Sequence, residues 1–374
     1  MKLMMIDGNS IINRAFYGIR MLNAPDGTPT NGVYGFITIM QRLLDDEKPD
    51  GVCAAFDLRA PTFRHLQYEG YKAQRKPMPE ELAVQLPVIK AVLDAMGIMR
   101  VELEGYEADD LLGTMSRMCE KSGDEAVIVT GDKDSFQLIT DRTRILHVKT
   151  RMGKTETINY TPARFFEEYG FEPPKMVDLK ALMGDTSDNI PGVPGIGEKT
   201  ALDLVRRFGS VRALYEQLDT ADIKDGVRKK LREGEESARM SYELATINTA
   251  APLDIDLRAA EWNYSFRPEL YDVFLKLGFT KFIEKYRLSP SEDTAPADAP
   301  ATGYAVTVLK TAEDASRAAA ALSGAGAYVW CADGLDAAAF LPEGGTAVYV
   351  LGPDFSGDRT QALRALFSAP AGLT

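Results

Sequence analysis

Short apolar runs alternate with longer helical patterns over the first half of the chain. The runs are KLMMI (2–6), GVCAAF (51–56) and EAVIVT (125–130), and a turn or polar cluster follows each. Runs of this length predict strands of a buried parallel sheet. Helical patterns cover roughly 32–46, 80–96 and 107–121. The order β-α-β-α-β therefore predicts a doubly wound α/β domain.

The pattern becomes helical from about residue 175 to 287. Helices are expected over 199–209, 210–218, 226–247 and 268–286. Residues 289–303 are rich in proline, alanine and acid, which is typical of a linker. Residues 304–374 return to an α/β pattern with YAVTVL, a helix near 312–323, AYVWC and AVYVL. So short a segment makes a thin core, and we expect it to be the beginning of a larger domain.

Acidic residues gather where ligands bind in such a sheet, just beyond the C-terminal ends of the strands. Helix capping or turn formation would explain each acidic cluster taken alone. Together, so many carboxylates on one edge would repel one another and raise their pKa values. Hard divalent cations would relieve this repulsion. The candidate ligands are Asp7, Asp57, Glu107, Asp109, Asp110, Asp132, Asp134, Asp185 and Asp188.

Two divalent ions about 3.5–4 Å apart would form a clamp for in-line displacement at a phosphodiester. We expect two Mg²⁺ ions, for which Mn²⁺ can substitute, because both prefer carboxylate oxygens.

A glycine-rich segment, GVPGIGEKTA (192–201), is the second candidate site. It is not a Walker A motif, because Glu198 separates Gly197 from Lys199. It is not a dinucleotide fingerprint either, because Thr200 occupies the place of the third glycine. A hairpin leading into a helix would present backbone N–H groups to a phosphate. The alternative is a plain glycine-rich turn between two helices.

The formal net charge of −12 argues against a nucleic-acid binder when taken alone. Basic residues are nevertheless clustered: residues 142–154 carry five and no acid, and 59–76 carry five against one acid. Residues 58–79 show no strong period and are basic and aromatic, so they form either a mobile arch or an ordinary solvated loop.

The chain shows no apolar run of 18 residues and no secretory signal at its start. Its three cysteines are widely spaced, which excludes a disulfide framework and fits a reducing compartment. We therefore expect a cytoplasmic protein with no membrane span.

Several motifs of this chain resemble motifs of one protein family, and they occur in the same order along the sequence. They are IDGNSIINRAFYG, AFDLRAPTFRH, YKAQRKPMPEEL, EGYEADDLLGT, VTGDKDSFQL, LMGDTSDNIPGVPGIGEKTA and GEESARMSYELATI. Over residues 1–287 the chain is similar to the 5′-nuclease domain of bacterial DNA polymerase I, which belongs to the flap endonuclease family.

The resemblance implies an α/β, PIN-like fold with a parallel sheet, a helical arch and an all-helical helix-hairpin-helix module. The catalytic domain would cover 1–174 with the arch at about 58–97, and the duplex-binding module would cover 175–288. The implied activity is removal of 5′ flaps and 5′→3′ exonucleolysis, leaving a 5′-phosphate and a 3′-hydroxyl. The implied partners are 5′-flap DNA, nicked duplex and RNA–DNA primer junctions, bound by a monomer that carries a polymerase domain in full-length relatives.

The resemblance also implies roles for single residues. The nine acids named above would bind the two ions, directly or through water. Lys72 and Arg75 would hold the scissile phosphate at the base of the arch. Arg14 and Arg64 would lie near the 5′ end of the substrate. The hairpin would grip the duplex backbone, with a K⁺ bound there, through Gly192, Gly195, Gly197 and Lys199.

The chain departs from the family at two places. Some relatives have an aromatic residue that stacks on a base where this chain has Asn13, with Phe16 and Tyr17 nearby. Residues 304–374 resemble the start of an RNase H-like proofreading exonuclease. Aligned on DGLD (333–336), they carry Val329 and Cys331 at the positions of its metal-binding acids. This implies a partial, inactive exonuclease-like segment with a structural role.

Three other functions are weighed against a two-metal 5′ nuclease. A non-catalytic DNA-binding module would gain nothing from nine carboxylates that repel phosphate. An RNA-cleaving nuclease of the PIN class usually lacks both the hairpin and the arch. A metal-dependent phosphatase acting on small molecules would leave the helical half of the chain without a purpose.

Overall fold

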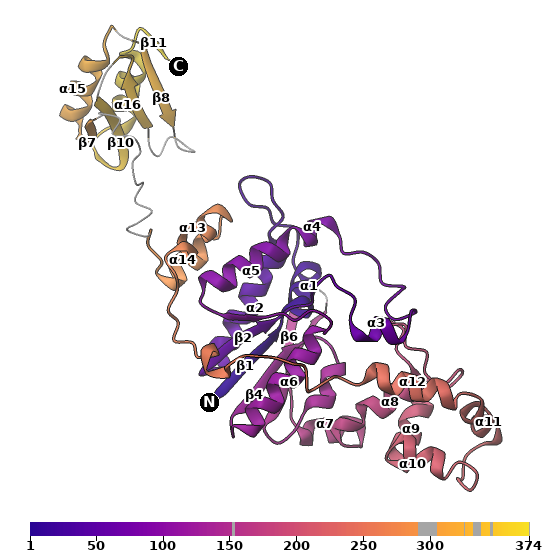
Figure 1. The fold of residues 1–374 in the computed structure, drawn as a ribbon. Coiled ribbons are helices and arrows are strands. Elements are labelled where there is room, and N and C mark those ends of the chain that lie inside the picture. Colours follow the sequence, from indigo (N-terminus) through magenta and orange to yellow (C-terminus); the bar gives the residue numbers. More distant parts are fainter. Residues whose placement is uncertain (152–153, 291–304, 325, 332–337, 345–346, 374) are drawn as a thin grey trace. The chain divides into compact units, whose positions relative to one another are not determined.

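The computed structural model describes residues 1–151, 154–290, 305–324, 326–331, 338–344 and 347–373. The chain divides into two units, Met1–Ser291 and Glu292–Thr374. The larger unit is built on a six-stranded sheet with the order β3-β2-β1-β4-β5-β6 (Figure 1). Its strands are β1 (Lys2–Asp7), β2 (Gly51–Ala55), β3 (Met99–Val101), β4 (Glu125–Thr130), β5 (Thr143–Arg151) and β6 (Lys154–Tyr160). Only the pairing of β5 with β6 is antiparallel.

The central strands are buried on both faces. In β1, Leu3 and Met5 pack into the core on one side of the sheet, whereas Met4 and Ile6 pack into the core on the other. Helices α1 (Gly8–Gly18), α2 (Asn31–Glu47) and α5 (Gln85–Ala95) cover the face of Met4, and α6 (Ala108–Lys121) covers the opposite face. Two-sided burial explains why these strands are uninterrupted apolar runs.

The three expected strands are confirmed, but β3, β5 and β6 were not expected. Strand β5 carries part of the basic run, and its charged residues hide four buried positions, Ile145 to Val148. Strand β3 has only three residues, which is too short for a periodic pattern. The actual sheet is therefore twice as wide as the predicted one.

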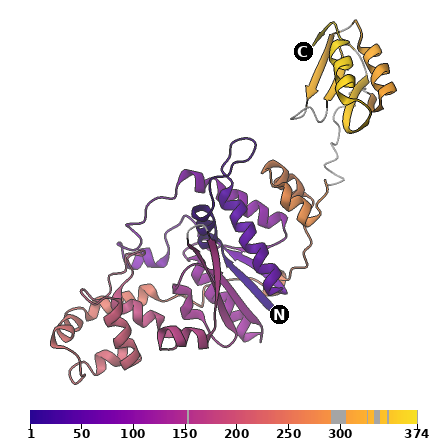
Figure 2. The same ribbon diagram turned by 180° about the vertical axis from the view of Figure 1, so that it is seen from behind.

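Helices form a module next to the sheet (Figure 2). They are α7 (Pro162–Tyr169), α8 (Met176–Met183), α9 (Glu198–Phe208), α10 (Val211–Glu216), α11 (Asp225–Glu233) and α12 (Glu235–Ala245), with the 3₁₀ turn η2 (Pro173–Lys175). The single helix expected over 226–247 is broken at Gly234. A side chain there would collide with Val193, since its Cβ would lie 2.8 Å from a methyl carbon of that residue.

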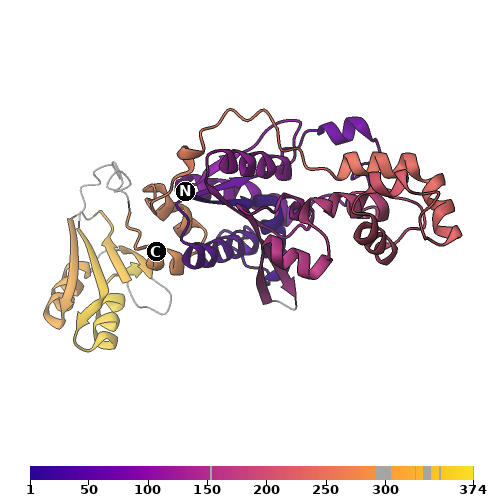
Figure 3. The same cartoon turned by 90° about the horizontal axis from the view of Figure 1, so that it is seen from below.

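The last helices of the larger unit correct the predicted domain boundary. The helix expected over 268–286 is two helices, α13 (Glu269–Lys276) and α14 (Thr280–Tyr286), separated by Gly278 at φ +71°. They pack against α2: the rings of Phe279 and Phe282 both lie 5.3 Å from that of Tyr34. The chain returns to the sheet through the 3₁₀ turn η3 (Leu257–Ala260), as Figures 1 and 3 show. Residues 268–286 thus belong to the core of the sheet domain.

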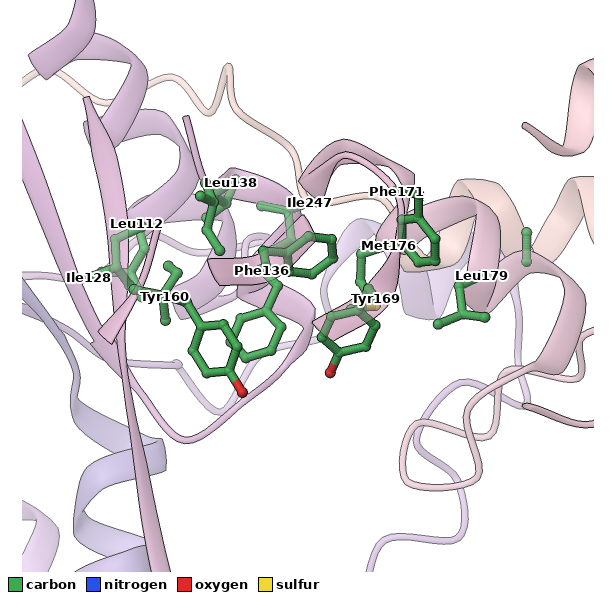
Figure 4. Close-up of a cluster of buried hydrophobic side chains, with 14 of the residues drawn as sticks. Leu112, Ile128, Phe136, Leu138, Tyr160, Tyr169, Phe171, Met176, Leu179 and Ile247 are labelled. Carbon is green, nitrogen blue, oxygen red and sulfur yellow. The ribbon is translucent and has the colours of Figure 1, made fainter. Parts of the chain in front are cut away.

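One continuous core joins the sheet to the helical module. Phe136, in the 3₁₀ turn η1 (Asp134–Leu138), lies 4.4 Å from the ring of Tyr160 and 5.9 Å from that of Phe165. Tyr169 and Met176 extend this cluster toward α8 (Figure 4). The shared aromatic cluster explains why the two predicted domains form a single compact unit.

The arch is shorter than expected. Its described helices are α3 (Phe63–Gln67) and the four-residue α4 (Glu80–Ala83). Helix α5 lies within the predicted arch range but packs on the sheet through Ile89, Val92 and Leu93. The segment at 68–75 docks on the loop between α8 and α9, where the Lys72 amide donates to the Asp188 carbonyl at 2.9 Å.

The smaller unit has a five-stranded sheet with the order β11-β8-β9-β10-β7. Its elements are β7 (Ala305–Thr311), α15 (Ala312–Leu322), β8 (Gly326–Cys331), β9 (Ala338–Pro342), β10 (Ala347–Ser356), α16 (Arg359–Ser368) and β11 (Gly372–Leu373). Val329 lies in β8, whereas the DGLD segment at 333–336 and most of the expected linker lie outside the described residues. None of the helices that the structure describes is both long and apolar enough to cross a membrane.

Candidate active site

The sheet brings the first acids together as expected. Asp7 ends β1 and pairs in register with Ala55, the last residue of β2. Asp57 lies two residues beyond Ala55, and Asp132 lies two residues beyond the end of β4. Since β2, β1 and β4 are neighbouring parallel strands, their acids reach the same edge.

Asp7 is held rigidly and is 6% exposed. Its carboxylate accepts from the Ser10 amide at 2.9 Å, which caps α1, and from the Thr130 hydroxyl at 2.8 Å. Burial raises its pKa to about 7, and the charges of Asp57 and Asp132 add to this effect. A cation beside Asp7 would remove much of this cost.

The pKa values of Asp109 and Asp57 are also raised by burial. Burial, followed by repulsion from Asp7, Asp132 and Asp134, raises the pKa of Asp109 well above its ordinary value. Burial also raises the pKa of Asp57, although the Ala108 amide donates to it at 2.7 Å. These carboxyl groups therefore share one buried, acidic region.

Asp134 and Asp185 meet at a buried lysine. The ammonium group of Lys180 contacts both carboxylates. Burial and the charge of Asp132 still raise the pKa of Asp134 to about 7. Burial also acts to raise the pKa of Asp185, but the charge and hydrogen bond of Lys180 outweigh it and hold the pKa at about 2.

Glu107 and Asp188 bind the base of the arch. Glu107 accepts from the Lys72 ammonium at 2.6 Å, and Asp188 accepts from Arg75 at 2.5 Å. The Tyr71 hydroxyl lies 3.0 Å from Glu107 and 3.2 Å from Asp188, between the two pairs. Lys72 adopts φ +54°, a conformation that costs a non-glycine residue about 1–3 kcal/mol. The fold thus holds both predicted phosphate-binding cations close to acids of the site.

Asp110 and Arg64 are placed differently from the expectation. Asp110 is fully buried and accepts from both terminal nitrogens of Arg64 at 2.8 Å. Arg64 is 3% exposed and also donates to the carbonyls of Leu244 and Thr246. A guanidinium so enclosed does not reach a DNA surface. The pair instead ties the arch to α6 and to the end of α12.

The hairpin residues divide into interior and surface positions. Gly192 is buried at φ +61°, where a Cβ would lie 2.2 Å from the Gly184 amide nitrogen, so only glycine fits. Gly195, Gly197 and Lys199 are exposed, and Gly197 precedes the first turn of α9. The carbonyl of Gly195 accepts from the Lys230 ammonium at 3.0 Å. A K⁺ ion at this carbonyl would have to displace Lys230.

The start of α1 lies beside the acidic edge. Arg14 is half-buried and donates to the Gly131 carbonyl, between Thr130 and Asp132. Asn13 is bonded within its own helix, to the Asn9 carbonyl at 2.8 Å. Tyr17 is 71% exposed and lines a pocket with Ser10, Asn13 and Arg14.

The acids fit a divalent cation by chemistry, although no finished cage is present. Within the described residues, no group of three acidic, histidine or cysteine side chains is arranged to hold one ion. The donors are all carboxylate oxygens, which hard cations prefer. Burial raises the pKa values of Asp7, Asp109 and Asp134, and repulsion from neighbouring acids adds to it, so a cation would stabilise their charged forms.

Two residues of the site were not anticipated. Lys180 is the one basic residue of α8, which is apolar apart from Lys180 and Asp178, and it lies five positions before Asp185. A lysine on so apolar a helix was a usable signal. Tyr71 precedes Lys72, but its contacts with Glu107 and Asp188 join residues 36 and 117 positions away. No local pattern shows such contacts.

Comparisons with known proteins agree with this geometry. Residues 2–170 match the family described as 5′-3′ exonuclease, N-terminal resolvase-like domain, and 171–267 match the 5′-3′ exonuclease, C-terminal SAM fold. DNA polymerase I of Bacillus subtilis is 44% identical over 79% of this chain and 33% of the relative. The thermostable DNA polymerase I of Thermus aquaticus is 37% identical over 83% of this chain and 36% of the relative. The chain thus spans about a third of these relatives.

The fold is also found in solved structures. The 5′-exonuclease of T5 with bound zinc superposes with a TM-score of 0.55 at 22% identity, over 77% of this chain and 98% of that one. A complex of the T5 D15 flap endonuclease with DNA and metal ions gives 0.54 at 21% identity, over 77% and 98%. Because both domain descriptions match in sequence order, and bacterial relatives are this similar, the chain belongs to the 5′-3′ exonuclease family.

Proposed function

We propose that this chain is a structure-specific 5′ nuclease. It would hydrolyse phosphodiesters at 5′ flaps and at nicked or frayed 5′ ends, including those of RNA primers, and leave a 5′-phosphate and a 3′-hydroxyl. The observation that carries this proposal is the buried carboxylate edge, with Lys72 and Arg75 held beside it. The relatives named DNA polymerase I and the T5 flap endonuclease bound to DNA support it.

The cofactor would be two Mg²⁺ ions, with Mn²⁺ as a substitute. Bound at this edge, they would lower the pKa of the attacking water and stabilise the leaving 3′ oxygen. Four acids that form no ion pair among the described residues are the first candidates to hold them: Asp7, Asp57, Asp109 and Asp132. Asp134, Asp185, Glu107 and Asp188 would complete the set once their cations turn to the substrate.

Lys72 and Arg75 would position the scissile phosphate. Both are bound to acids at the base of the arch. A phosphate at the edge offers the same charge as those acids, so the two cations can exchange one partner for the other. They would then orient the phosphate and offset its charge where Glu107 and Asp188 lie.

The helical module would hold the duplex without reading bases. The exposed Gly195, Gly197 and Lys199 stand at the beginning of α9, where backbone N–H groups suit a phosphate. Contacts of this kind position DNA but carry no sequence information. Selectivity would come from unpairing the terminal nucleotides, which costs least at flaps and nicks.

The direct test is cleavage of a 5′-labelled duplex that carries a single-stranded 5′ flap. We expect one cut near the junction with Mg²⁺ and none with EDTA. Asp134→Asn should abolish the cut and retain flap binding, because a charge is lost without a change of shape. Wild-type cleavage by this variant would contradict the assignment of Asp134.

A non-catalytic DNA-binding module remains the second candidate, favoured by the absence of a ready-made three-residue cage among the described residues. Tight flap binding with no cut in Mg²⁺ or Mn²⁺ would establish it and exclude the nuclease.

A further inference from the structure

A cavity of about 450 Å³ opens between the acidic edge, β5 and α8. Its lining includes Arg14, Lys133, His147, Lys149 and Tyr169, together with Asp132 and Asp134 of the acidic edge. This volume lies within the range of pockets that hold small polar ligands. The mechanism above gives no role to Lys133, His147, Lys149 or Tyr169, whereas the family resemblance places Arg14 near the 5′ end of the substrate.

Four lining residues carry a buried polar atom with no hydrogen-bond partner among the described residues: the Nε of Arg14, the Oδ1 of Asp134, the Nδ1 of His147 and the hydroxyl of Tyr169. The Asp134 oxygen contacts the Lys180 ammonium, which leaves the other three. His147 is 2% exposed, and its other ring nitrogen lies 3.0 Å from the Gly131 carbonyl, to which it must donate. An unmade buried hydrogen bond costs about 1–3 kcal/mol. Three such atoms around one cavity indicate a polar ligand.

The charge of the cavity selects the kind of ligand. Arg14, Lys133, Lys149 and Lys180 are basic, against Asp132, Asp134 and Glu198. Asp134 is already paired with Lys180, whereas Lys133 and Lys149 form no ion pair within the described residues. Burial, and then the charges of Lys149, Arg14 and Lys133, lower the pKa of His147 to about 4. The ring of His147 is therefore neutral, and its free Nδ1 is a hydrogen-bond acceptor. The other available groups are cations or donors, namely Lys133, Lys149, the Nε of Arg14 and the Tyr169 hydroxyl, and these suit an anion.

We propose that this cavity is a phosphate subsite that holds a backbone phosphate next to the scissile one. The Nε of Arg14 and the Tyr169 hydroxyl would donate to its oxygens, and Lys133 and Lys149 would supply charge. The scissile phosphate itself must lie at the acidic edge, so the cavity takes a neighbouring phosphate of the same DNA. The identity of the ligand as DNA rests on the proposed function, whereas the phosphate chemistry does not.

The first experiment tests the phosphate chemistry without DNA. The chain has two histidines, so a ¹³C-histidine-labelled protein gives two ring signals, and His65 serves as the internal reference. In EDTA, inorganic phosphate should shift the His147 signal saturably, whereas sodium chloride of equal ionic strength should not. Absence of a saturable shift, or an equal shift of both histidines, would overturn the proposal.

Tyr169→Phe removes only the hydroxyl and should weaken phosphate binding about 3- to 10-fold. Because that hydroxyl has no hydrogen-bond partner in the described part of the chain, the variant should be at least as stable as the wild type in urea. Tyr160→Phe is the matched control: its hydroxyl donates to Glu168 at 2.7 Å outside the cavity, so it should lose stability and keep phosphate affinity. A loss of stability in Tyr169→Phe with unchanged phosphate binding would contradict the proposal.

The second experiment asks whether the phosphate belongs to DNA. Flap duplexes are bound in EDTA, with each phosphate near the junction replaced in turn by a neutral methylphosphonate. Lys149→Ala should weaken binding about 3- to 10-fold on unmodified DNA. It should have no effect when one particular neighbouring phosphate is neutral. Lys121→Ala, on the exposed end of α6, controls for the loss of one charge.

The two experiments separate the possible failures. If the wild type binds no DNA, the proposed function fails while the phosphate experiment still decides the chemistry of the cavity. If the wild type binds DNA and no modified position cancels the effect of Lys149→Ala, the cavity serves free phosphate only, and the inference about a backbone phosphate is wrong.

Discussion

The acids of the site fall into two regions that differ in how their charge is balanced. At the ends of β1, β2 and β4 and the first turn of α6, the unpaired acids form no ion pair among the described residues. Around the arch and the α8–α9 loop, each acid contacts a lysine or arginine. The unpaired acids are Asp7, Asp57, Asp109 and Asp132; the paired acids are Glu107, Asp110, Asp185 and Asp188. Asp134 lies at the boundary, since it contacts Lys180 and yet keeps a raised pKa.

The pKa values show what this difference means. Among the unpaired acids, burial and mutual repulsion raise the pKa of Asp7 to about 7. Among the paired acids, Lys180 holds the pKa of Asp185 at about 2 in spite of burial. Mutual repulsion in the first arrangement lowers stability, and the cations of the proposed mechanism would relieve it. In the second arrangement, the acids hold Lys72, Arg75 and Lys180 beside the place where a phosphate is proposed to bind.

The largest effect is expected from Asp7→Asn, which removes one charge from the unpaired acids. Cleavage of a flap substrate in Mg²⁺ should fall by at least about 10³-fold, the size typical of lost electrostatic stabilisation. Binding should change less than about 3-fold. Single-turnover rates and binding isotherms in EDTA measure the two effects.

Asp124→Asn controls for loss of a buried acid elsewhere, because Asp124 pairs with the N-terminal ammonium group. It should keep the cleavage rate at temperatures where it is folded. Comparable cleavage by Asp7→Asn and Asp124→Asn would remove the distinction between the two regions.

Arg64→Ala should give the next largest effect, on stability. It leaves the buried charge of Asp110 without its bidentate partner, which costs about 3–5 kcal/mol. Urea denaturation measures the change. Arg258→Ala breaks a half-exposed pair with Asp124 and should cost less than about 1 kcal/mol. Similar losses in the two variants would show that the Arg64 pair is solvated.

Lys72→Ala should reduce turnover about 100-fold, because its charge is expected to act on the scissile phosphate. Affinity for the duplex should fall less than about 3-fold, since the helical module is proposed to supply most of the duplex contacts. Lys72→Arg, which keeps the charge, should recover part of the rate. An equal loss of turnover and affinity would mean that Lys72 only positions DNA.

The smallest effect concerns pH. In EDTA, the raised pKa of Asp7 contributes stability that is complete below about pH 4 and is lost as pH rises through about 7. The free energy of unfolding of the wild type, relative to Asp7→Asn, should therefore fall as the pH rises from about 4 to about 7 and stay constant above that. Saturating Mg²⁺ should abolish this fall. A constant difference between the two proteins would show that Asp7 has an ordinary pKa.

Much of the fold follows from short-range patterns. Strands β1, β2 and β4 can be predicted because five or six consecutive residues in each are buried on both faces of the sheet. The common position of the acids beyond them follows from the geometry of parallel strands. Strand β5 was not predicted from the sequence, because its buried central residues lie between charged residues. The pattern predicted one helix where the structure has α11 and α12, because a single glycine lowers helix propensity only modestly. The close approach of Val193, which leaves no room for a side chain at Gly234, is a contact between residues distant in sequence.

Local chemistry in the chain thus specified strands β1, β2 and β4, the acids that follow them, the glycine hairpin and the basic arch, since each depends on a few consecutive residues. Only the folded chain decided which acid meets which cation. The partners of Asp110 and Asp188 lie 46 and 113 residues away, and Lys180 reaches Asp134 from another helix. Charge pairing and burial depend on distance in space, which is set by packing of the whole core rather than by spacing along the chain.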